Sequence, residues 1–424
     1  MPKTRVPRAA WHACAAALAL LLAAPALAGP PTVEVLHWMT SGGQAKAMKS
    51  LKDDLEAQGG RWIDTPVGGG ASDDALTKLR ARVIAGDAPS SVQLKGPLIQ
   101  EWGALKVLQP IDEVAAAGQW EKALPRSVAE VMKYQGRWVA APVNVHRLDW
   151  MYANPAVLQK VGITMPTTWE QFDAAAVKLK AAGITPLAHG GQAWQDASLW
   201  EVVLISVGGP AFHRQALVQL DPKALTSDTM KKVFDRMRIL RGYVDANFSG
   251  RDWNLATAMI MNGEAGFQIM GDWVKGDMSA AGKQPGKDYV CANPPNDAGG
   301  FLYIVDSFAM FTSKDPDRAA GQKLFAKLLM EPKFQENFNL AKGSIPVRTD
   351  MKLDKFDSCA LAARDQMMKT IDSGGFAPSA IHDMAVPSAV KGAITDLVTK
   401  HFNSSMSSEE AVRLLAQGIK QARE

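Results

Sequence analysis

The first third of the chain alternates short β-rich segments with helical ones, and this alternation constrains the fold more than any other feature. Residues 33–38 are β-rich, a Thr-Ser-Gly-Gly turn follows, and apolar residues then recur at helical spacing up to Leu55. The pattern repeats with expected strands at 61–65 and 91–94 and expected helices at 73–85 and 99–105. Repeated βα units of this kind predict a parallel sheet covered by helices.

Polar and aromatic residues stand where two of these strands end. Ligands of open α/β sheets bind beyond the carboxyl ends of the strands, and both Trp38 and Lys95 fall there. The alternative readings are a half-buried aromatic for Trp38 and a solvated turn residue for Lys95. Because the two occupy equivalent strand ends, together they predict a ligand edge more strongly than either alone.

The N-terminus has the pattern of a secretory signal peptide. Basic residues are followed by an apolar run from Ala13 to Ala24 and by Ala26-Leu27-Ala28, which predicts cleavage after Ala28. The alternative is a permanent membrane helix, but the run is shorter than the ~20 apolar residues that a bilayer requires. We therefore expect a soluble, exported mature protein, located in the periplasm.

The charge of the mature chain is close to neutral. The whole sequence has 47 Lys and Arg against 43 Asp and Glu, and the leader removes three of the basic residues and none of the acidic ones. The remaining balance gives no electrostatic footprint for nucleic acid or for an anionic membrane, so neither is expected as a partner.

Two cysteines remain after the leader, which contains Cys14, is removed. An oxidising compartment allows Cys291 and Cys359 to pair, and we expect a disulfide between them. The alternative is two separately buried thiols, since the sequence does not show that the two approach each other.

The chain is expected to build one lobe, leave it, and return. Residues 134–146 form an extended, Pro-containing passage, residues 290–295 are a second Pro-rich passage, and helical segments dominate between them. Two of these helices are expected at 168–182, capped by Thr167 or Thr168, and at 228–246, and a last helix is expected with Ser407 or Ser408 as its cap. Two lobes joined by more than one strand suggest a hinge with a central cleft. The expected division is a signal peptide at 1–28, an N-lobe at 29–142 and 293–346, and a C-lobe at 143–292 and 347–424.

Motifs for catalysis, metals and nucleotides are missing from the sequence. The histidines outside the leader show no His-Glu-x-x-His or i,i+4 pairing, and the glycine-rich segment at 276–284 lacks the spacing and the Ser or Thr of a phosphate loop. No nucleophile elbow is present either. We expect no metal and no cofactor. The 12 tryptophans are compatible with a carbohydrate site, where an aromatic ring covers the apolar face of a sugar, although most of them are expected to fill cores.

Several motifs spread over the mature chain resemble one protein family, the extracellular solute-binding proteins of bacterial ATP-binding-cassette (ABC) sugar importers. The chain is most similar to the glucose/mannose-binding branch. The motifs are Leu36-His-Trp-Met-Thr-Ser-Gly-Gly43, Pro166-Thr-Thr-Trp-Glu-Gln-Phe172, Met261-Asn-Gly-Glu-Ala-Gly-Phe267, Gly271-Asp-Trp273 and Ala341-Lys-Gly-Ser-Ile-Pro-Val-Arg348, with Leu94-Lys-Gly96, Asn144-Val-His-Arg147, Val305-Asp-Ser307 and Ile381-His-Asp-Met384 for the branch.

The resemblance implies a periplasmic-binding-protein-like α/β fold whose two lobes close on one sugar and present it to an ABC permease in the membrane. It implies that Trp38 stacks on a hexose, glucose or mannose, and that Trp273 forms a second aromatic wall. It also implies that Lys95, Asp306, Lys342 and His382 bind the sugar hydroxyls. His146 is expected to be structural, and the protein is expected to be a monomer without catalytic activity.

The sequence departs from that branch at two positions. Met39 stands where relatives usually have a second tryptophan, and Gln44 stands where they commonly have glutamate. Methionine lacks a rigid π face, and an amide is a weaker acceptor than a carboxylate. The hypothesis from this departure is that Met39→Trp tightens glucose binding.

Two other functions fit parts of the same sequence. A secreted carbohydrate hydrolase would use two cleft carboxylates, with Asp272 and Asp306 as candidates. A non-catalytic adhesin or chemotaxis presenter would use the same sugar cleft with a different partner.

Overall fold

The computed structural model describes residues 29–68 and 72–424. The expected signal peptide, residues 1–28 with Cys14, lies outside these residues. Among the described helices, none combines the length and the apolar character that a bilayer crossing requires.

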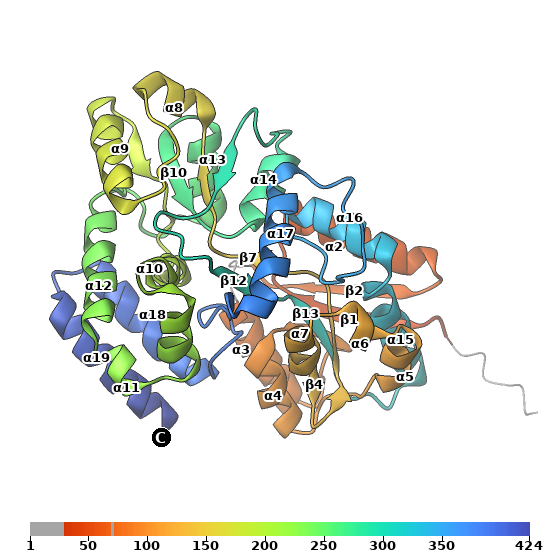
Figure 1. The fold of residues 1–424 in the computed structure, drawn as a ribbon. Helices are drawn as coiled ribbons and strands as arrows, with labels where there is room; N and C mark the ends of the chain where they lie inside the picture. The colour runs from red at the N-terminus through yellow and green to blue at the C-terminus, as the bar shows by residue number, and fades with distance from the viewer. Residues whose placement is uncertain (1–28, 69–71) are drawn as a thin grey trace, which may run out of the picture.

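The first sheet, called here the N-terminal sheet, has the strand order β2-β1-β3-β13-β6 (Figure 1). β1 pairs in parallel with both β2 and β3, as the βα alternation predicted. β13 pairs antiparallel with β3 and β6, so the complete sheet is mixed. The alternation did not predict this strand, which returns from late in the chain and enters in the opposite direction. The strands are β1 (Thr32–His37), β2 (Arg61–Pro66), β3 (Ser91–Leu94), β6 (Ala140–Pro142) and β13 (Ser307–Met310).

Helices from both the early and the late part of the chain cover the N-terminal sheet. α2 buries Ala47, Met48, Leu51 and Leu55 at helical spacing, and α15 packs on β1. The helices are α2 (Gly42–Ala57), α3 (Ser72–Ile84), α4 (Gly96–Ala104), α15 (Pro316–Leu329) and α16 (Pro332–Lys342). The connection to β6 contains α5 (Asp112–Ala117), α6 (Trp120–Ala123), α7 (Arg126–Val131), β4 (Lys133–Tyr134) and β5 (Arg137–Trp138).

A second sheet, the middle sheet, has the order β11-β8-β10-β9. Its strands are β8 (Met151–Ala153), β9 (Thr185–Leu187), β10 (Ala265–Ile269) and β11 (Val290–Ala292). The helices around it are α8 (Pro155–Val161), α9 (Trp169–Ala181), α13 (Trp253–Met261) and α14 (Trp273–Ala280). The Thr168 hydroxyl accepts a hydrogen bond from the Gln171 amide at 3.2 Å and caps α9, at one of the two positions that the sequence suggested.

A helical layer adjoins the middle sheet (Figure 1). In it, α10 packs against both α12 and α18. α12 ends at Arg241 before Gly242, so the helix is shorter than the expected 228–246. The Ser407 hydroxyl accepts from the Glu410 amide at 3.1 Å and starts the last helix, as expected. The layer consists of α10 (Ala193–His213), η2 (Arg214–Val218), α11 (Pro222–Leu225), α12 (Asp228–Arg241), α18 (Ser388–Phe402) and α19 (Ser408–Arg423).

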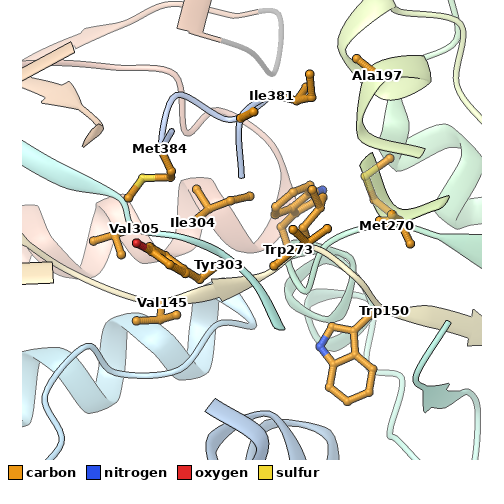
Figure 2. Packing of buried hydrophobic residues seen from close by; sticks show 14 of the residues in the cluster. Val145, Trp150, Ala197, Met270, Trp273, Tyr303, Ile304, Val305, Ile381 and Met384 are labelled. Atoms are coloured by element: carbon orange, nitrogen blue, oxygen red, sulfur yellow. The ribbon is translucent and has the colours of Figure 1, made fainter. Parts of the chain in front are cut away.

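The crossing sheet, with the order β14-β12-β7, lies where the chain passes between these parts. Its strands are β7 (His146–Arg147), β12 (Phe301–Ile304) and β14 (Phe376–Pro378). The passages at 143–145 and 305–306 run side by side, because the Val143 amide donates to the Asp306 carbonyl oxygen at 2.9 Å. In Figure 2, Val145 and Val305 from these passages and Ile304 at the end of β12 belong to the same buried apolar cluster as Trp273.

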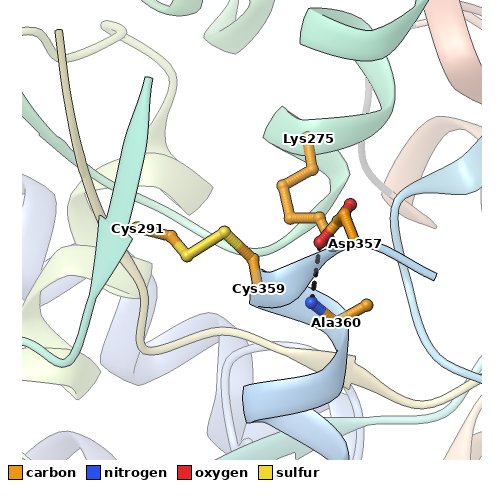
Figure 3. The surroundings of a disulfide bond; sticks show 5 residues. All are labelled: Lys275, Cys291, Asp357, Cys359 and Ala360. Carbon is orange, nitrogen blue, oxygen red and sulfur yellow. Dashed lines mark hydrogen bonds and ion pairs between the residues drawn. A yellow bond between two sulfur atoms is a disulfide. The ribbon is translucent and has the colours of Figure 1, made fainter. Parts of the chain in front are cut away.

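The expected disulfide is present and joins Cys291 of β11 to Cys359 at the start of α17 (Ser358–Ser373), with 6.2 Å between the two Cα atoms (Figure 3). Next to it, the Asp357 carboxylate accepts from the Ala360 amide at 2.8 Å and pairs with the buried Lys275 ammonium at 2.9 Å. The disulfide therefore ties the start of α17 to the edge of the middle sheet.

Candidate functional site

A cavity of about 150 Å³ lies between the end of the N-terminal sheet and the helical layer. Trp38 follows β1 directly and Lys95 follows β3 directly, so neighbouring parallel strands supply one wall. The beginnings of α10 and α18 supply the other. The residues that line the cavity are Trp38, Ser72, Asp73, Lys95, Ala193, Trp194, Ile381, His382, Lys391 and Thr395.

A glycine makes the turn at Lys95 possible. Gly96 has a φ of +37°, and a Cβ atom built on it would stand 2.4 Å from the carbonyl oxygen of Asp383. Only glycine fits this close approach. The backbone after β3 therefore passes directly against the 381–384 loop that carries His382.

Lys95 links the aromatic wall to a buried carboxylate. Its Nζ atom lies 5.3 Å from the centroid of the Trp38 ring and 3.4 Å from Oδ1 of Asp306. Gln93 also connects Trp38 to Asp306. Its Oε1 accepts a hydrogen bond from the Trp38 amide at 3.2 Å, and its Nε2 donates to Asp306 Oδ1 at 3.0 Å. These contacts fix the positions of the ring and the ammonium relative to each other.

The other oxygen of Asp306 accepts from a second set of donors. Oδ2 of Asp306 accepts a hydrogen bond from Asn144 Nδ2 at 3.1 Å. It also lies 3.1 Å from His146 Nε2 and 3.3 Å from Lys342 Nζ. Asp306 and Asn144 lie on the two adjacent chain passages, and Lys342 ends α16. The cluster is therefore built at the junction between the sheets. Each ammonium carries three N–H donors, so Lys95 retains donors that can bind a ligand in the cavity.

The charges of this cluster depend on one another. Burial alone would raise the pKa of Asp306, but Lys342 and Lys95 outweigh it and hold that pKa well below the usual range. Burial lowers the pKa of Lys342 against the attraction of Asp306. For His146, burial favours a lower pKa, but the Asp272 and Asp306 carboxylates raise it. Asp306 is therefore the ionised group around which the cations gather.

The two carboxylates proposed for a hydrolase do not face a substrate. Asp272 contacts Nδ1 of His146, and Asp306 contacts Nε2 of the same ring. Both acids are 2% exposed, and the imidazole fills the space between them. An acid and base pair requires substrate or water in that space. The hydrolase alternative is therefore wrong. The expectation that His146 is structural agrees with this bridging position.

A group of aromatic rings lies where α10 and α14 begin. Trp273 contacts His146 edge-on at 5.3 Å between ring centroids and contacts His382 at 5.5 Å. Trp194 completes the group, with its ring centroid 6.0 Å from that of His382 and 6.4 Å from that of Trp273. The Trp273 Nε1 atom is buried without a hydrogen-bond partner in the described part of the chain.

His382 is oriented so that one ring nitrogen is free to accept. The Ser198 hydroxyl donates to the Trp194 carbonyl oxygen at 2.7 Å, so Nε2 of His382 is the donor in its 2.8 Å contact with Ser198 Oγ. Burial, together with the charges of Lys95 and Lys391, holds the pKa of His382 well below its usual value. The ring is therefore neutral near pH 7, with Nδ1 as its acceptor.

All the residues suggested for the site are connected by contacts, but only some of them line the cavity. Trp38, Lys95 and His382 line the cavity. Asp306, Lys342 and Trp273 lie behind the walls and reach the lining through contacts with Lys95, Asp306 and His382 respectively.

Sequence reasoning missed Trp194, Gln93 and Lys391. Trp194 follows a Gly-Gly-Gln-Ala segment at the start of α10, and Gln93 is an amide in β3, two residues before Lys95. Both positions are signals that the sequence contains. Lys391 carries no such signal, because it lies on the ordinary helical pattern of α18.

Met39 and Gln44 lie elsewhere. Met39 is 1% exposed and lines a separate cavity of about 350 Å³, together with His37, Met48 and Trp62. Gln44 is half-buried in the first turn of α2 and is not part of the lining. This geometry gives no support to the hypothesis that a tryptophan at position 39 would stack on the ligand of Trp38.

Larger hollows occur on the surface. One of about 500 Å³ lies between α5 and α15, and one of about 540 Å³ lies between α11 and α19. Neither contains the buried charged cluster. Within residues 29–68 and 72–424, no group of His, Cys, Asp and Glu side chains has the arrangement of a metal site.

Comparison with known proteins identifies close relatives. A family model described as bacterial extracellular solute-binding protein matches residues 42–336. A protein of Brucella suis named "probable sugar-binding periplasmic protein" is 48% identical over 391 residues, which is 92% of each chain. A protein of the same name from Rhizobium meliloti is 47% identical over 408 residues, covering 96% of this chain and 98% of the relative.

Solved structures confirm the fold. The bacterial solute receptor AcbH, described as preferring β-D-galactopyranose, superposes with a TM-score of 0.78 over 93% of this chain and 99% of its own, at 17% identity. The solute-binding protein RafE, described in complex with raffinose, gives a TM-score of 0.72 over 93% and 100% of the two chains, at 18% identity. The expected periplasmic-binding-protein fold is therefore correct.

Proposed function

Because this chain belongs to the bacterial extracellular solute-binding protein family, whose members bind solutes rather than transform them, we propose that it captures a sugar in the cavity between Trp38 and Trp194. The mature protein then delivers the sugar to the membrane permease of an ABC importer. The observation that carries the proposal is the lining of the cavity: two indole rings, an ammonium and a neutral imidazole around a space the size of a small molecule.

The chemistry of that lining suits a sugar ring. Indole faces cover the C–H faces of a pyranose, while the Lys95 ammonium and the His382 imidazole supply directional hydrogen bonds to hydroxyls. The volume of about 150 Å³ is below the ~300–1,000 Å³ typical of sites for drug-sized ligands, which favours one ring over an oligosaccharide.

The roles divide between direct contact and support. Trp38 stacks on the ring, Trp194 forms the opposite aromatic wall with Trp273 packed behind it, and Lys95 and His382 bind hydroxyls. Asp306 holds Lys95 in place and pairs with Lys342 through its other oxygen. Asp306 and Lys342 each bind a hydroxyl where the ligand reaches behind the wall.

The ligand is a hexose, with glucose or mannose as the first candidates. This choice rests on the motif resemblance and on relatives named as sugar-binding, among them a glucose-binding protein of Saccharolobus solfataricus that is 23% identical over 154 residues, or 35% of this chain.

Binding is coupled to closure of two lobes. The proposed lobes are residues 29–142 with 293–346 and residues 143–292 with 347–424. The passage at 143–145, which lies beside 305–306, is the proposed hinge at the first boundary. A sugar that contacts both walls favours the closed form by its differential affinity. The protein acts as a monomer in the periplasm after cleavage behind Ala28.

A thermal-shift and calorimetry screen of residues 29–424 tests the proposal. D-glucose, D-mannose, D-galactose and D-xylose are the probes, and sorbitol, which has no ring, is the control. A ligand that binds only the native state raises its melting temperature by mass action. One or more of the hexoses is expected to do so while sorbitol does not. The proposal fails if no sugar changes either the melting temperature or the heat of mixing.

A further inference from the structure

An ion pair closes one end of the cavity. Lys391 of α18 places its Nζ atom 3.0 Å from Oδ1 of Asp73 and 2.8 Å from Oδ1 of Asp383. The Ser72 hydroxyl donates to the other oxygen of Asp383 at 2.9 Å. Ser72, Asp73 and Lys391 all belong to the cavity lining.

The exposed fractions of these side chains show that the ion pair lies at the solvent end of the cavity. The side chain of Asp73 is 72% exposed, whereas those of Lys391 and Asp383 are 10% and 5% exposed. The cluster therefore runs from solvent at Asp73 to the interior at Asp383, and the Asp73–Lys391 pair stands at the outer end.

The pair joins parts of the molecule that belong to different layers. Asp73 lies in the first turn of α3, which packs on β1 of the N-terminal sheet, while Lys391 lies on α18, which packs on α10 and α19. Asp383 belongs to the loop that leads into α18, so its contact with Lys391 persists if the layers separate. The contact between Lys391 and Asp73 is lost if the layers separate, because it exists only when α3 and α18 are close together.

Lys391 is suited to this contact because it stays charged. Burial alone would lower the pKa of Lys391, but the Asp383 and Asp73 carboxylates raise it above the usual value. Asp383 neutralises the buried ammonium locally, and the exposed Asp73 adds a second, reversible partner.

We propose that the Asp73–Lys391 ion pair is the gate of the sugar cavity: it limits the ligand to a single ring and slows release. The proposal rests on the proposed function. A ring substituted on the side that faces α3 must displace the pair to enter the cavity, and a bound ring must break it to leave. Specificity for a monosaccharide then arises from a contact that need not touch the sugar.

The test compares Asp73→Asn with a matched control, Asp74→Asn. Asp74 lies in the same turn of α3 and carries the same charge, but has no ion pair within residues 29–68 and 72–424. Both substitutions remove one charge from the helix N-terminus, and only the first removes the gate. Release of D-glucose and D-mannose is followed by stopped-flow tryptophan fluorescence, since Trp38 and Trp194 line the cavity. Affinities for maltose, cellobiose and gentiobiose are measured by calorimetry.

The wild type is expected to prefer the monosaccharide by at least about tenfold. Asp73→Asn is expected to release the monosaccharide about two- to fivefold faster, which is the effect of losing a solvent-exposed ion pair. The ratio of monosaccharide to disaccharide affinity is expected to fall by a similar factor. The same change made in a Lys391→Met background should have no further effect. Identical behaviour of Asp73→Asn and Asp74→Asn overturns the proposal, and faster release with an unchanged preference rejects the size limit. If the wild type binds none of these sugars, it is the proposed function itself that fails.

Discussion

The Lys95 ammonium lies 5.3 Å from the centroid of the Trp38 ring, and the two residues follow adjacent parallel strands. One sheet edge thus presents an aromatic face and a cation to the same cavity. The distance is within the range of a cation–π contact, so the ring also helps to hold the charge in position.

Trp38→Ala is expected to weaken sugar binding about tenfold, because the apolar face of the sugar loses its stacking partner. Trp38→Phe should retain part of the affinity. Trp62→Phe is the control, since Trp62 lies on the neighbouring strand but lines a different cavity. Calorimetry with D-glucose and D-mannose measures all three, and an affinity of Trp38→Ala equal to that of the control would contradict the stacking role.

Asp306→Asn is expected to lower the free energy of unfolding by about 3 kcal/mol, because it leaves the buried ammoniums of Lys95 and Lys342 without their shared counter-charge. Urea denaturation at pH 7 measures the loss. Adding Lys342→Met should recover part of the stability. Asp365→Asn, at an exposed position of α17, is the control for an ordinary charge loss. Equal stabilities of Asp306→Asn and this control would show that Asp306 does not neutralise the charges of Lys95 and Lys342.

His401 is expected to make the protein sensitive to acid. Burial, together with the nearby Arg238 charge, lowers the pKa of His401 to about 4 from its ordinary value of 6.5, and neither ring nitrogen has a hydrogen-bond partner within the described residues. The unfolded state binds the proton more tightly, so stability is complete above the unfolded pKa and falls as the pH drops from 6.5 toward 4. The contribution is about 3 kcal/mol.

The variant His401→Phe tests this linkage. Its ring would pack beside Phe234, whose ring centroid is 4.9 Å from that of His401. Urea denaturation at pH 7 and pH 4.5 should show a smaller loss of stability for the variant than for the wild type. The same loss in both proteins would assign the acid sensitivity to other groups.

Removing the disulfide is expected to cost stability and leave binding intact. The bond closes a loop between residues 68 positions apart, which corresponds to about 4 kcal/mol in the chain-entropy model. The double variant Cys291→Ala, Cys359→Ala should unfold at lower urea, and the wild type in a reducing agent should approach it. Neither cysteine lines the cavity, so the sugar affinity should be unchanged. A large loss of affinity would instead couple the disulfide to the cavity.

Local sequence signals predicted much of the fold. The strands at 61–66 and 91–94 and the cap of the last helix at Ser407 follow from alternation and hydrogen-bonding propensity, which act over a few residues. The antiparallel pairing of β13 does not follow from such local signals, because its partners β3 and β6 lie more than 150 positions earlier in the chain. Pairing over that distance leaves no mark in the residues of the strand itself.

The sequence by itself determined that Trp38 and Lys95 lie at one sheet edge, that Cys291 and Cys359 are available to pair, and that the chain leaves one α/β layer and returns. Only the tertiary structure decided that Asp306 is shared by Lys95 and Lys342, that Trp194 faces the cavity, and that Asp73 meets Lys391. The reason is physical: strand and helix patterns arise from neighbours in the chain, whereas buried charges and cavity walls are assembled from segments that meet only when the layers pack.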